Sequence, residues 1–278
     1  MTQSADPISI EDQNTDRQFV NALARGLELL RCFQPGKAYL TNADLARETG
    51  FPKPTVSRLT YTLCKLGYLE FSEHLGKYQL ASGVLGLGYS MLANLDVRNL
   101  ARPAMQELAE HSRVSVAIGV RDRLSMIYVE TCRSSARVTL RLDVGSRIPI
   151  ATTSMGKALI CGMADDERDG VMDEIRNADP ENWSRLRKDL EKAFRDYDST
   201  GFCIALGEWQ PEIRAVGVPL LGMRGEKQMA FNCGGPAYLL ARDKLETDLG
   251  PRLVELVRNV EKSMGGYASL PNSTKGTA

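Results

Sequence analysis

The stretch LTNADLARETGFPKPTVSRLTYTLCKLGY, residues 40–68, decides the fold of the N-terminal part of the chain. Thr41 is a favourable helix N-cap, and Asp44 follows three residues later, so the two form an approximate capping box. A short helix is therefore expected over residues 42–49. Gly50 is well placed to end it, because glycine readily adopts the left-handed conformation that closes many helices.

A second helix is expected from about Pro54 to Leu66, since Pro52 and Pro54 are tolerated only before or within its first turn. Its apolar residues recur at spacings of three, four and three, and the stripe that they form is expected to pack on the preceding helices: Val56, Leu59, Leu63 and Leu66. Two helices joined by a tight turn are typical of a helix-turn-helix, whose second helix enters the DNA major groove.

The opposite face of this second helix carries side chains suited to DNA. Arg58 can form a bidentate pair with guanine, and short hydroxyl side chains can reach phosphates or base edges. Lysine suits phosphates, because a point charge needs no fine geometry. The alternative is an amphipathic helix whose polar face is only solvated. The candidate DNA-binding residues are Lys53, Thr55, Ser57, Arg58, Tyr61, Thr62, Lys65 and, in the following hairpin, Lys77.

The distribution of charge favours DNA binding over a merely solvated face. The whole chain has 35 basic and 35 acidic residues, so its net charge is zero. Residues 1–16 carry four acids and no base, whereas residues 17–80 carry nine bases and five acids. A locally basic module in a neutral protein suits a regulator that should not adhere to all DNA.

A chain of 278 residues is natural for two domains, and the hydrophobic periodicity predicts an α+β protein. We expect tails at 1–17 and 266–278 that are disordered, a DNA-binding domain at 18–81, a linker helix at 82–97 and a second domain at 98–265. Period-two alternation predicts strands at 68–71, 77–81, 114–121, 125–131, 138–142, 202–206, 213–221 and 228–233. Helical patterns are found at 19–33, 99–112, 154–161, 165–175, 184–198 and 242–264, the last with a break or kink at Gly250-Pro251.

Several motifs taken together resemble the IclR family of bacterial transcription regulators over residues 18–265. Their order and spacing carry the resemblance: ARGLELL at 24–30, TGFPKPTVSRL at 49–59, LGY at 66–68, GSRIP at 145–149, SMGKAL at 154–159 and VGVPL at 216–220. The family implies a winged helix, a linker helix and a GAF-like effector domain in which helices flank an antiparallel sheet. It also implies dimers that pair into tetramers, a DNA operator and control by a small molecule.

The start of the expected helix at residue 154 is a candidate effector site, because free N–H groups and the helix dipole attract an anion there. Gly156 would let a ligand approach closely, Met155 would narrow the pocket, and Trp209 is a candidate aromatic wall. The resemblance implies the rest, although the stretch around Trp209 departs from the family pattern. The candidate effector-binding residues are Ser154, Met155, Gly156, Trp209, Ala215, Asn232 and Gly234, and the expected ligand is a small organic acid, aromatic acids included.

An enzyme fused to a DNA-binding module is disfavoured, and we expect no catalytic residue, no metal site and no cofactor. The only histidines are His74, in the expected wing, and His111, at a helix end, and no nucleotide-binding glycine fingerprint follows a strand. The six cysteines form no CxxC pair, and with no signal peptide or long apolar run the chain is expected to be cytoplasmic. A redox sensor that uses Cys161, Cys203 or Cys233 is an alternative.

Overall fold

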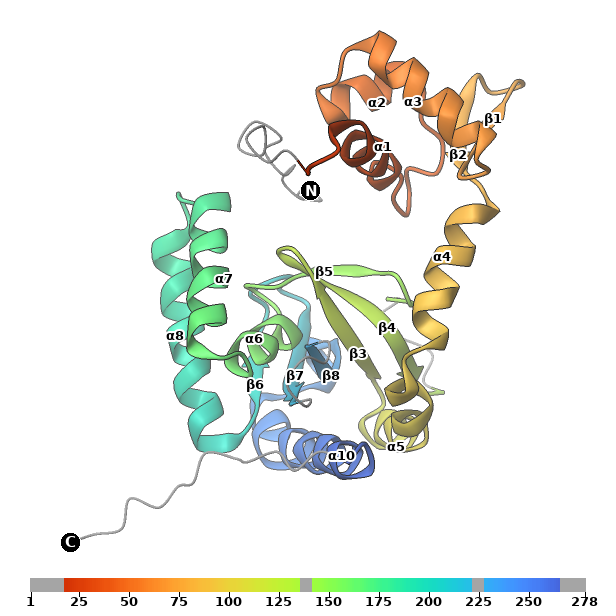
Figure 1. The fold of residues 1–278 in the computed structure, drawn as a ribbon. Helices are drawn as coiled ribbons and strands as arrows, with labels where there is room; N and C mark the ends of the chain where they lie inside the picture. Colours follow the sequence, from red (N-terminus) through yellow and green to blue (C-terminus); the bar gives the residue numbers. More distant parts are fainter. Residues whose placement is uncertain (1–17, 136–141, 222–227, 266–278) are drawn as a thin grey trace, which may run out of the picture. The chain divides into compact units, whose positions relative to one another are not determined.

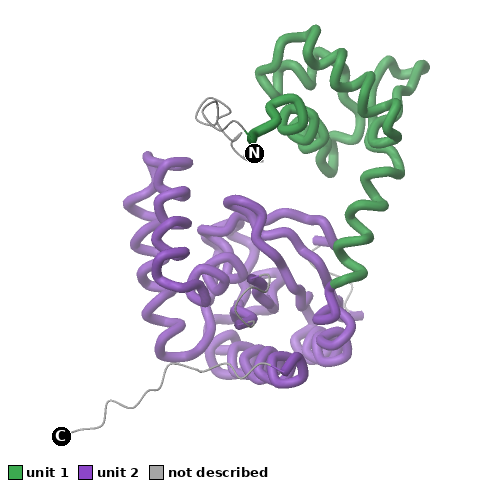
Figure 2. The backbone as a smooth tube through the Cα atoms, viewed as in Figure 1, with its two compact units in different colours: residues 1–94 green, residues 95–278 purple. Residues whose placement is uncertain are grey.

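The structure is a computed structural model that describes residues 18–135, 142–221 and 228–265. The two expected tails lie outside this part of the chain, as does nearly all of the expected strand 138–142. The chain divides into two compact units, Met1–Asn94 and Leu95–Ala278 (Figure 2). Each unit is described by itself.

The first unit is a winged helix followed by one further helix (Figure 1). Its small core is formed by residues from three helices and from the strand that follows them. The elements are α1 (Asn21–Arg31), α2 (Asn42–Thr49), α3 (Lys53–Lys65), the antiparallel pair β1 (Leu69–Ser72) and β2 (Lys77–Leu80), and α4 (Ser82–Ala93).

The expected boundaries of α2 are confirmed, and so is the capping box. The Thr41 hydroxyl accepts a hydrogen bond from the Asp44 main-chain N–H at 3.1 Å, and the Asp44 carboxylate accepts from the Thr41 N–H at 3.0 Å. Gly50 ends the helix with φ of 71°, in the left-handed region. The chain therefore turns sharply between α2 and α3, as the sequence predicts.

The prediction of the buried face of α3 is wrong in part, because Thr60 belongs to that face and Leu66 does not. Val56 and Thr60 are fully buried and Leu63 nearly so, whereas Leu59 is half-buried and Leu66 is 63% exposed. Thr60 can be buried because its hydroxyl donates to the Val56 carbonyl at 3.0 Å, a hydrogen bond that satisfies the polar group inside the helix.

Apolar side chains lie at the surface of the first unit on both α1 and α4. Val20, Leu23 and Leu27 predicted the α1 helix, yet they are more than half exposed, because α1 turns Gly26 and Leu29 to the core. In α4 no residue is buried, although the helix is apolar. Its first turn is nevertheless attached to the turn between α3 and β1, since the Gly83 N–H donates to the Gly67 carbonyl at 3.1 Å.

The second unit is built on a six-stranded antiparallel sheet in the order β5-β4-β3-β8-β7-β6, which fits the expected α+β class. The long strands β3 and β8 lie at its centre, and their partners β4 and β7 flank them. The strands are β3 (Ser115–Asp122), β4 (Ser125–Arg133), β5 (Arg147–Pro149), β6 (Cys203–Ala205), β7 (Ile213–Leu220) and β8 (Met229–Pro236).

Helices cover both faces of this sheet (Figure 1). Helix α6 packs on β7, β8 and β4, and a pair of helices, α7 and α8, packs beside it; α5 and α10 contact the sheet and each other. The helices are α5 (Asp96–Ser112), α6 (Ser154–Cys161), α7 (Asp165–Ala178), α8 (Trp183–Thr200) and α10 (Gly250–Ser263), preceded by the short α9 (Arg242–Lys244) and by a π-helical turn at Leu245–Leu249.

Two elements of this unit differ from expectation. Helix α5 begins at Asp96 rather than 99, inside the segment expected to be linker, and the short strand β5 was not expected. At the expected break or kink at Gly250-Pro251 the helix does not break, and a π-helical turn lies directly before it. Such a turn lets the helix continue into Pro251, which has no N–H to donate.

A β-bulge in β4 decides which of its side chains meet the two faces of the sheet. Gly119 pairs with Tyr128 and Ile118 pairs with Glu130, so Val129 is the extra residue. Without the bulge, Tyr128 and Glu130 would lie on the same face. With it, Tyr128 packs in the core around α6, while Glu130 pairs with arginines of α5.

Candidate functional site

The polar face of α3 is a continuous exposed surface. Six of the eight candidate DNA-binding residues are exposed there, and Thr55 and Lys77 are half-buried. Thr62 is partly engaged, because its hydroxyl donates to the Arg58 carbonyl at 2.9 Å. The exposed six are Lys53, Ser57, Arg58, Tyr61, Thr62 and Lys65.

The basic side chains on this surface keep their charge available. Within the part of the chain that the structure describes, no carboxylate forms an ion pair with Lys53, Arg58, Lys65 or Lys77. The Lys65 ammonium lies 5.6 Å from the centre of the Tyr61 ring, a cation–π contact that orders both side chains. This surface can therefore neutralise phosphates without first breaking internal ion pairs.

Asn42, at the start of α2, was not among the expected site residues, yet it supports α3. Its amide donates to the Ser57 hydroxyl at 3.5 Å, and its side-chain oxygen accepts from the Thr60 hydroxyl at 3.4 Å. Nothing in the spacing along the sequence could have shown this, since the contacts cross fifteen and eighteen residues. Both are long contacts that join the start of α2 to α3.

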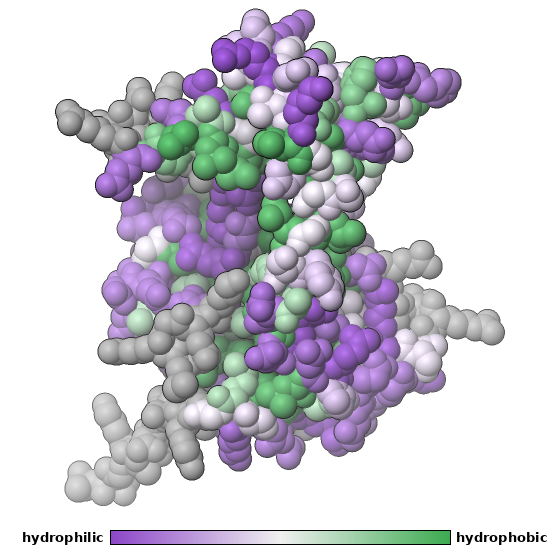
Figure 3. All heavy atoms as spheres, turned by 45° about the vertical axis from the view of Figure 1, so that its right-hand side comes forward, coloured by the Kyte–Doolittle hydropathy of each residue, from purple (hydrophilic) through white to green (hydrophobic). Residues whose placement is uncertain are grey.

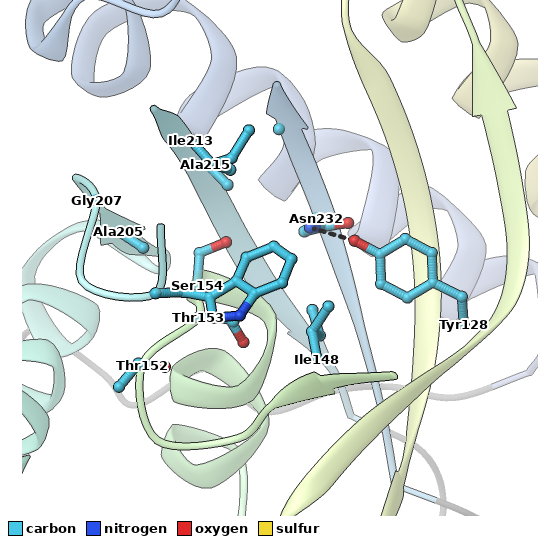
Figure 4. Close-up of a pocket in the computed structure, with 12 residues that line it drawn as sticks. Tyr128, Ile148, Thr152, Thr153, Ser154, Ala205, Gly207, Ile213, Ala215 and Asn232 are labelled. Carbon is cyan, nitrogen blue, oxygen red and sulfur yellow. Dashed lines mark hydrogen bonds between the residues drawn. The ribbon is translucent and has the colours of Figure 1, made fainter. Parts of the chain in front are cut away.

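In the second unit a small pocket lies at the start of α6, between that helix and the sheet (Figure 4). The empty space around it is about 350 Å³, a figure that includes open solvent at its mouth, and the enclosed part has room for little more than one water molecule. Its lining residues come from β4 and β5, the start of α6, the end of β6, the segment between β6 and β7, and β7 and β8: Tyr128, Ile148, Thr152, Thr153, Ser154, Ala205, Gly207, Trp209, Ile213, Ala215, Asn232 and Gly234.

Five of the seven candidate effector residues are brought together in this lining: Ser154, Trp209, Ala215, Asn232 and Gly234. Met155 and Gly156 are not. Met155 is fully buried and its sulfur fills the space where Gly119 has no side chain, so it does not narrow the pocket. Gly156 lies against the Ile150 main chain, where a Cβ would come within 2.0 Å of the Ile150 carbonyl oxygen; packing rather than ligand access requires it.

Polar groups lie at two ends of the pocket. Among the described residues, the Ser154 hydroxyl has no hydrogen-bond partner although it is 1% exposed. Opposite it, the Asn232 amide donates to the Tyr128 hydroxyl at 3.2 Å (Figure 4). Burial raises the pKa of Tyr128 to about 12, only partly countered by the hydrogen bond from Asn232, so this hydroxyl stays protonated and can donate.

The start of α6 is capped by a neighbouring threonine. The Thr153 hydroxyl caps the helix by accepting from the Gly156 N–H at 3.2 Å, and it donates to the Pro149 carbonyl at 2.7 Å. No described group accepts a hydrogen bond from the main-chain N–H of Ser154 or Met155. Main-chain N–H groups, a hydroxyl and the positive end of a helix dipole are groups that favour an anion.

Two further features of the second unit bear on the alternatives. The Cys161 and Cys203 sulfurs lie 3.4 Å apart, but both residues are buried, and burial, together with the hydrogen bond to Cys161, raises the pKa of Cys203 well above its usual range. His111 pairs with Asp248 at 3.0 Å on the surface, away from the pocket lining. Among the described residues no group of three His, Cys, Asp or Glu side chains could hold a metal ion, and no helix is long and apolar enough to cross a membrane.

Two protein-family models match this chain, one in its N-terminal part and one in its C-terminal part. The IclR helix-turn-helix domain model matches residues 22–73, which hold the exposed face of α3. The model of the bacterial transcriptional regulator IclR C-terminal domain matches residues 89–262, which hold the pocket.

Individual proteins agree with these matches. The HTH-type transcriptional regulator TsaQ1/TsaQ2 of Comamonas testosteroni is 32% identical over 254 residues, with 91% of each chain covered. The crystal structure of an IclR family transcriptional regulator from Brucella abortus is 48% identical, covers 90% of this chain and 94% of its own, and has a TM-score of 0.84.

A more distant IclR homologue, from Microbacterium hydrocarbonoxydans, was crystallised in complex with 4-hydroxybenzoate. It is 21% identical, covers 88% of this chain and 99% of its own, and has a TM-score of 0.66, which shows a shared fold. The relatives are named as regulators of transcription rather than as enzymes. With a helix-turn-helix match over α3 and an effector-domain match over the pocket, the chain belongs to the IclR family of bacterial transcriptional regulators.

Proposed function

We propose that this regulator binds a pseudo-palindromic DNA operator through α3 and responds to a small organic acid, aromatic acids included, held at the start of α6. The observation that carries the ligand part is the buried, unpartnered Ser154 hydroxyl beside two free main-chain N–H groups. A carboxylate would supply the acceptors that these donors lack.

The remaining lining supports an aromatic ligand with a second polar group. Ile148, Trp209 and Ile213 give apolar walls, and the Tyr128–Asn232 pair offers a donor at the other end. Among the described residues that line the pocket there is no lysine, arginine or histidine, so helix-end donors rather than one of these cations would hold the carboxylate. The homologue crystallised with 4-hydroxybenzoate makes that compound a natural probe.

Calorimetric titration tests the ligand part with matched pairs of compounds. We expect 4-hydroxybenzoate and related carboxylates to bind, and the corresponding amides to bind on the order of tenfold or more weakly, because hydrogen bonds to a charged acceptor are stronger. A pocket that bound only the neutral amides would contradict the proposal.

The DNA part is tested on an operator selected from a random library. Arg58→Ala should cost about 1–3 kcal/mol of binding free energy and relax specificity at one base pair, because Arg58 is proposed to contact a base. Lys77→Ala should weaken all sequences alike and reduce the salt dependence by about one charge. An equal loss on random DNA with Arg58→Ala would show that this residue contacts only phosphate.

A pseudo-palindromic operator needs a two-fold protein, and we propose that a second copy of this chain covers the apolar surfaces of the first unit. Figure 3 shows apolar surface over the winged-helix unit and along α4. On α4, Leu85, Leu87 and Tyr89 are 74%, 60% and 69% exposed. An exposed apolar helix is costly in a monomer, and burial against its own copy removes that cost. A tetramer made of two dimers is implied only by membership of the IclR family.

A thiol sensor is the second candidate function, favoured by the 3.4 Å distance between the Cys161 and Cys203 sulfurs. Burial opposes it, because the thiolate is the reactive form and the pKa of Cys203 is raised. Cys161→Ser and Cys203→Ser variants whose DNA binding still changes with peroxide as in the parent protein would remove this candidate.

A further inference from the structure

The segment between β6 and β7, residues 206–212, forms one side of the pocket through Gly207 and Trp209. It is largely exposed and has little regular structure. Gly207 has φ of 112°, and a Cβ there would lie 3.2 Å from the Pro211 main chain, so the segment folds back tightly on itself. The positions of Gly207 and Trp209 therefore depend on the contacts that hold residues 206–212 against the rest of the second unit.

One ion pair joins the segment to α6. The Lys157 ammonium lies 2.8 Å from the Glu208 carboxylate, whose other oxygen accepts from the Leu206 N–H. The Lys157 side chain is only 3% exposed and that of Glu208 is 28% exposed. Burial acts to raise the pKa of Glu208, but Lys157 and the hydrogen bonds outweigh it and lower that pKa overall, so the carboxylate stays charged.

The energetics of this pair favour a closed segment. Within the described residues Glu208 is the carboxylate paired with Lys157, and lifting the segment would leave a buried ammonium without its partner. A charge left uncompensated in the interior is strongly unfavourable, far more than the loss of an exposed ion pair. Yet Glu208 lies near enough to water for the pair to break and re-form.

We propose that the Lys157–Glu208 pair is a latch that holds residues 206–212 as a lid on the pocket and so sets how fast a ligand enters and leaves. Lys157 and Glu208 are positioning residues in this scheme, since neither lines the pocket; they act through Gly207 and Trp209. The same helix carries Ser154 at its first residue, so α6 contributes both the anion site and the anchor of the lid. This inference rests on the proposed function of the pocket as a ligand site.

Trp209 reports the position of the lid without any ligand. The chain has two tryptophans, so Trp183→Phe leaves Trp209 as the sole emitter. In that background, acrylamide quenching of Trp209 should rise roughly three- to tenfold in Glu208→Gln, because the open state becomes more populated. Glu212→Gln is the matched control: an exposed carboxylate in the same segment with no ion pair among the described residues, whose loss should leave quenching unchanged.

Lys157→Met is a second variant that tests the latch if Glu208→Gln folds poorly. It replaces the buried ammonium by an apolar side chain of similar length, so it releases the lid without leaving a charge in the interior. Quenching should rise as in Glu208→Gln, with the unfolding transition retained. Quenching equal to the parent in both variants, or an equal rise in Glu212→Gln, would overturn the latch.

Stopped-flow exchange with 4-hydroxybenzoate completes the test. Association and dissociation rate constants should both rise roughly three- to tenfold in the two latch variants, with a smaller change in their ratio, because a lid governs passage more than contact. Unchanged rates in a variant with raised quenching would overturn the lid's role. If no carboxylate binds even the parent, the proposed ligand class fails, and quenching alone then decides the latch.

Discussion

Ser154 and Thr153 are adjacent hydroxyl residues at the start of α6. Their hydroxyl groups differ in their hydrogen-bond partners, and we therefore expect them to affect the stability of the fold differently. The Thr153 hydroxyl has two main-chain partners, whereas the buried Ser154 hydroxyl has none among the described residues. A buried polar group without a partner costs free energy that a ligand could recover. The fold therefore bears a local cost at the place where we propose that a carboxylate binds.

Substitution of these two residues should separate stability from binding. Ser154→Ala should leave the free energy of unfolding unchanged or raise it by up to about 1 kcal/mol, while carboxylate affinity falls on the order of tenfold or more. Thr153→Ala should lower the free energy of unfolding by about 1 kcal/mol through loss of the cap. Urea unfolding and calorimetry measure both quantities. A clear loss of stability in Ser154→Ala would show that its hydroxyl has a partner in solution.

Asp44 gives a prediction about pH in the first unit. Hydrogen bonds from the Thr41 hydroxyl and main chain, together with Arg47, hold the pKa of its carboxyl well below the usual range. A depressed carboxyl pKa contributes stability above the ordinary value, about 4, that is lost as the pH falls toward the folded value. In Thr41→Ala the Asp44 pKa should rise toward that ordinary value, as an NMR titration would show. An unchanged titration would mean that the main-chain hydrogen bond and Arg47 set the pKa without the Thr41 hydroxyl.

At the scale of elements, the sequence predicted most of the fold because local signals coincide with packing. The capping box, the left-handed Gly50 and the alternating strands are all local; the first two are found, and so are the expected strands except the one at 138–142, nearly all of which lies outside the described residues. The errors arise where tertiary contacts decide. Thr60 is buried because the helix carbonyls and Asn42 satisfy its hydroxyl, which no apolar periodicity can indicate.

The pocket shows the same limit. Ser154 could be singled out from the helix start and Trp209 from its aromatic ring, and Ala215, Asn232 and Gly234 came from the family pattern. Tyr128 was missed, since its orientation depends on the bulge at Val129. Met155 and Gly156 were misplaced, because a helix residue one or two positions from a pocket residue points elsewhere, here toward Gly119 and Ile150.

The close approach of α6 to β7 can be tested with a pair of glycines. A Cβ at Gly217 would lie 2.3 Å from the Ser154 carbonyl oxygen, so Gly217→Ala must push the start of α6 away from the sheet. We expect a loss of about 1–3 kcal/mol in unfolding free energy, as for overpacked cores, and a weakened pocket.

Gly170 in α7 is the matched control, because nothing lies within 4 Å of the position of its Cβ and the residue is exposed. Gly170→Ala should raise the unfolding free energy by up to about 1 kcal/mol, since alanine favours the helix. Equal effects of the two substitutions would contradict the packing described for α6.

At the scale of the whole molecule, ligand control requires a physical link from the pocket strand toward the DNA-binding unit. Tyr128 lines the pocket, and across the bulge Glu130 pairs with Arg98 at 3.1 Å and Arg102 at 2.6 Å. These arginines lie in the first two turns of α5, which follows α4 through Asn94 and Leu95. A ligand that shifts β4 would thus shift the start of α5.

Glu130→Gln should therefore reduce the effect of ligand on operator binding. Coupling free energies between sites are commonly 1–3 kcal/mol, and we expect the ligand-induced change in operator affinity to fall at least about fivefold, with ligand affinity nearly unchanged. Fluorescence anisotropy with and without 4-hydroxybenzoate measures it. Asp143→Asn, which breaks an exposed pair with Arg133, is the control. Full coupling in Glu130→Gln would place the link elsewhere.

Assembly is the last property that the molecule as a whole should show. Leu85 is the most exposed large apolar residue of α4 and follows Gly83, whose N–H is hydrogen-bonded to the turn between α3 and β1. If a second copy covers this helix, Leu85→Glu buries a charge at the interface and should shift the protein toward monomer in light scattering, because an unpaired buried charge is strongly unfavourable. Binding to a two-half-site operator should weaken more than tenfold, while binding to a single half-site stays the same, since only the two-site complex needs the dimer.

Ser184→Glu is the control for this prediction. Ser184 is exposed on α8, so the substitution adds the same charge outside α1 and α4 and should leave both measurements unchanged. A Leu85→Glu protein that remains dimeric would place the two-fold contact away from α4.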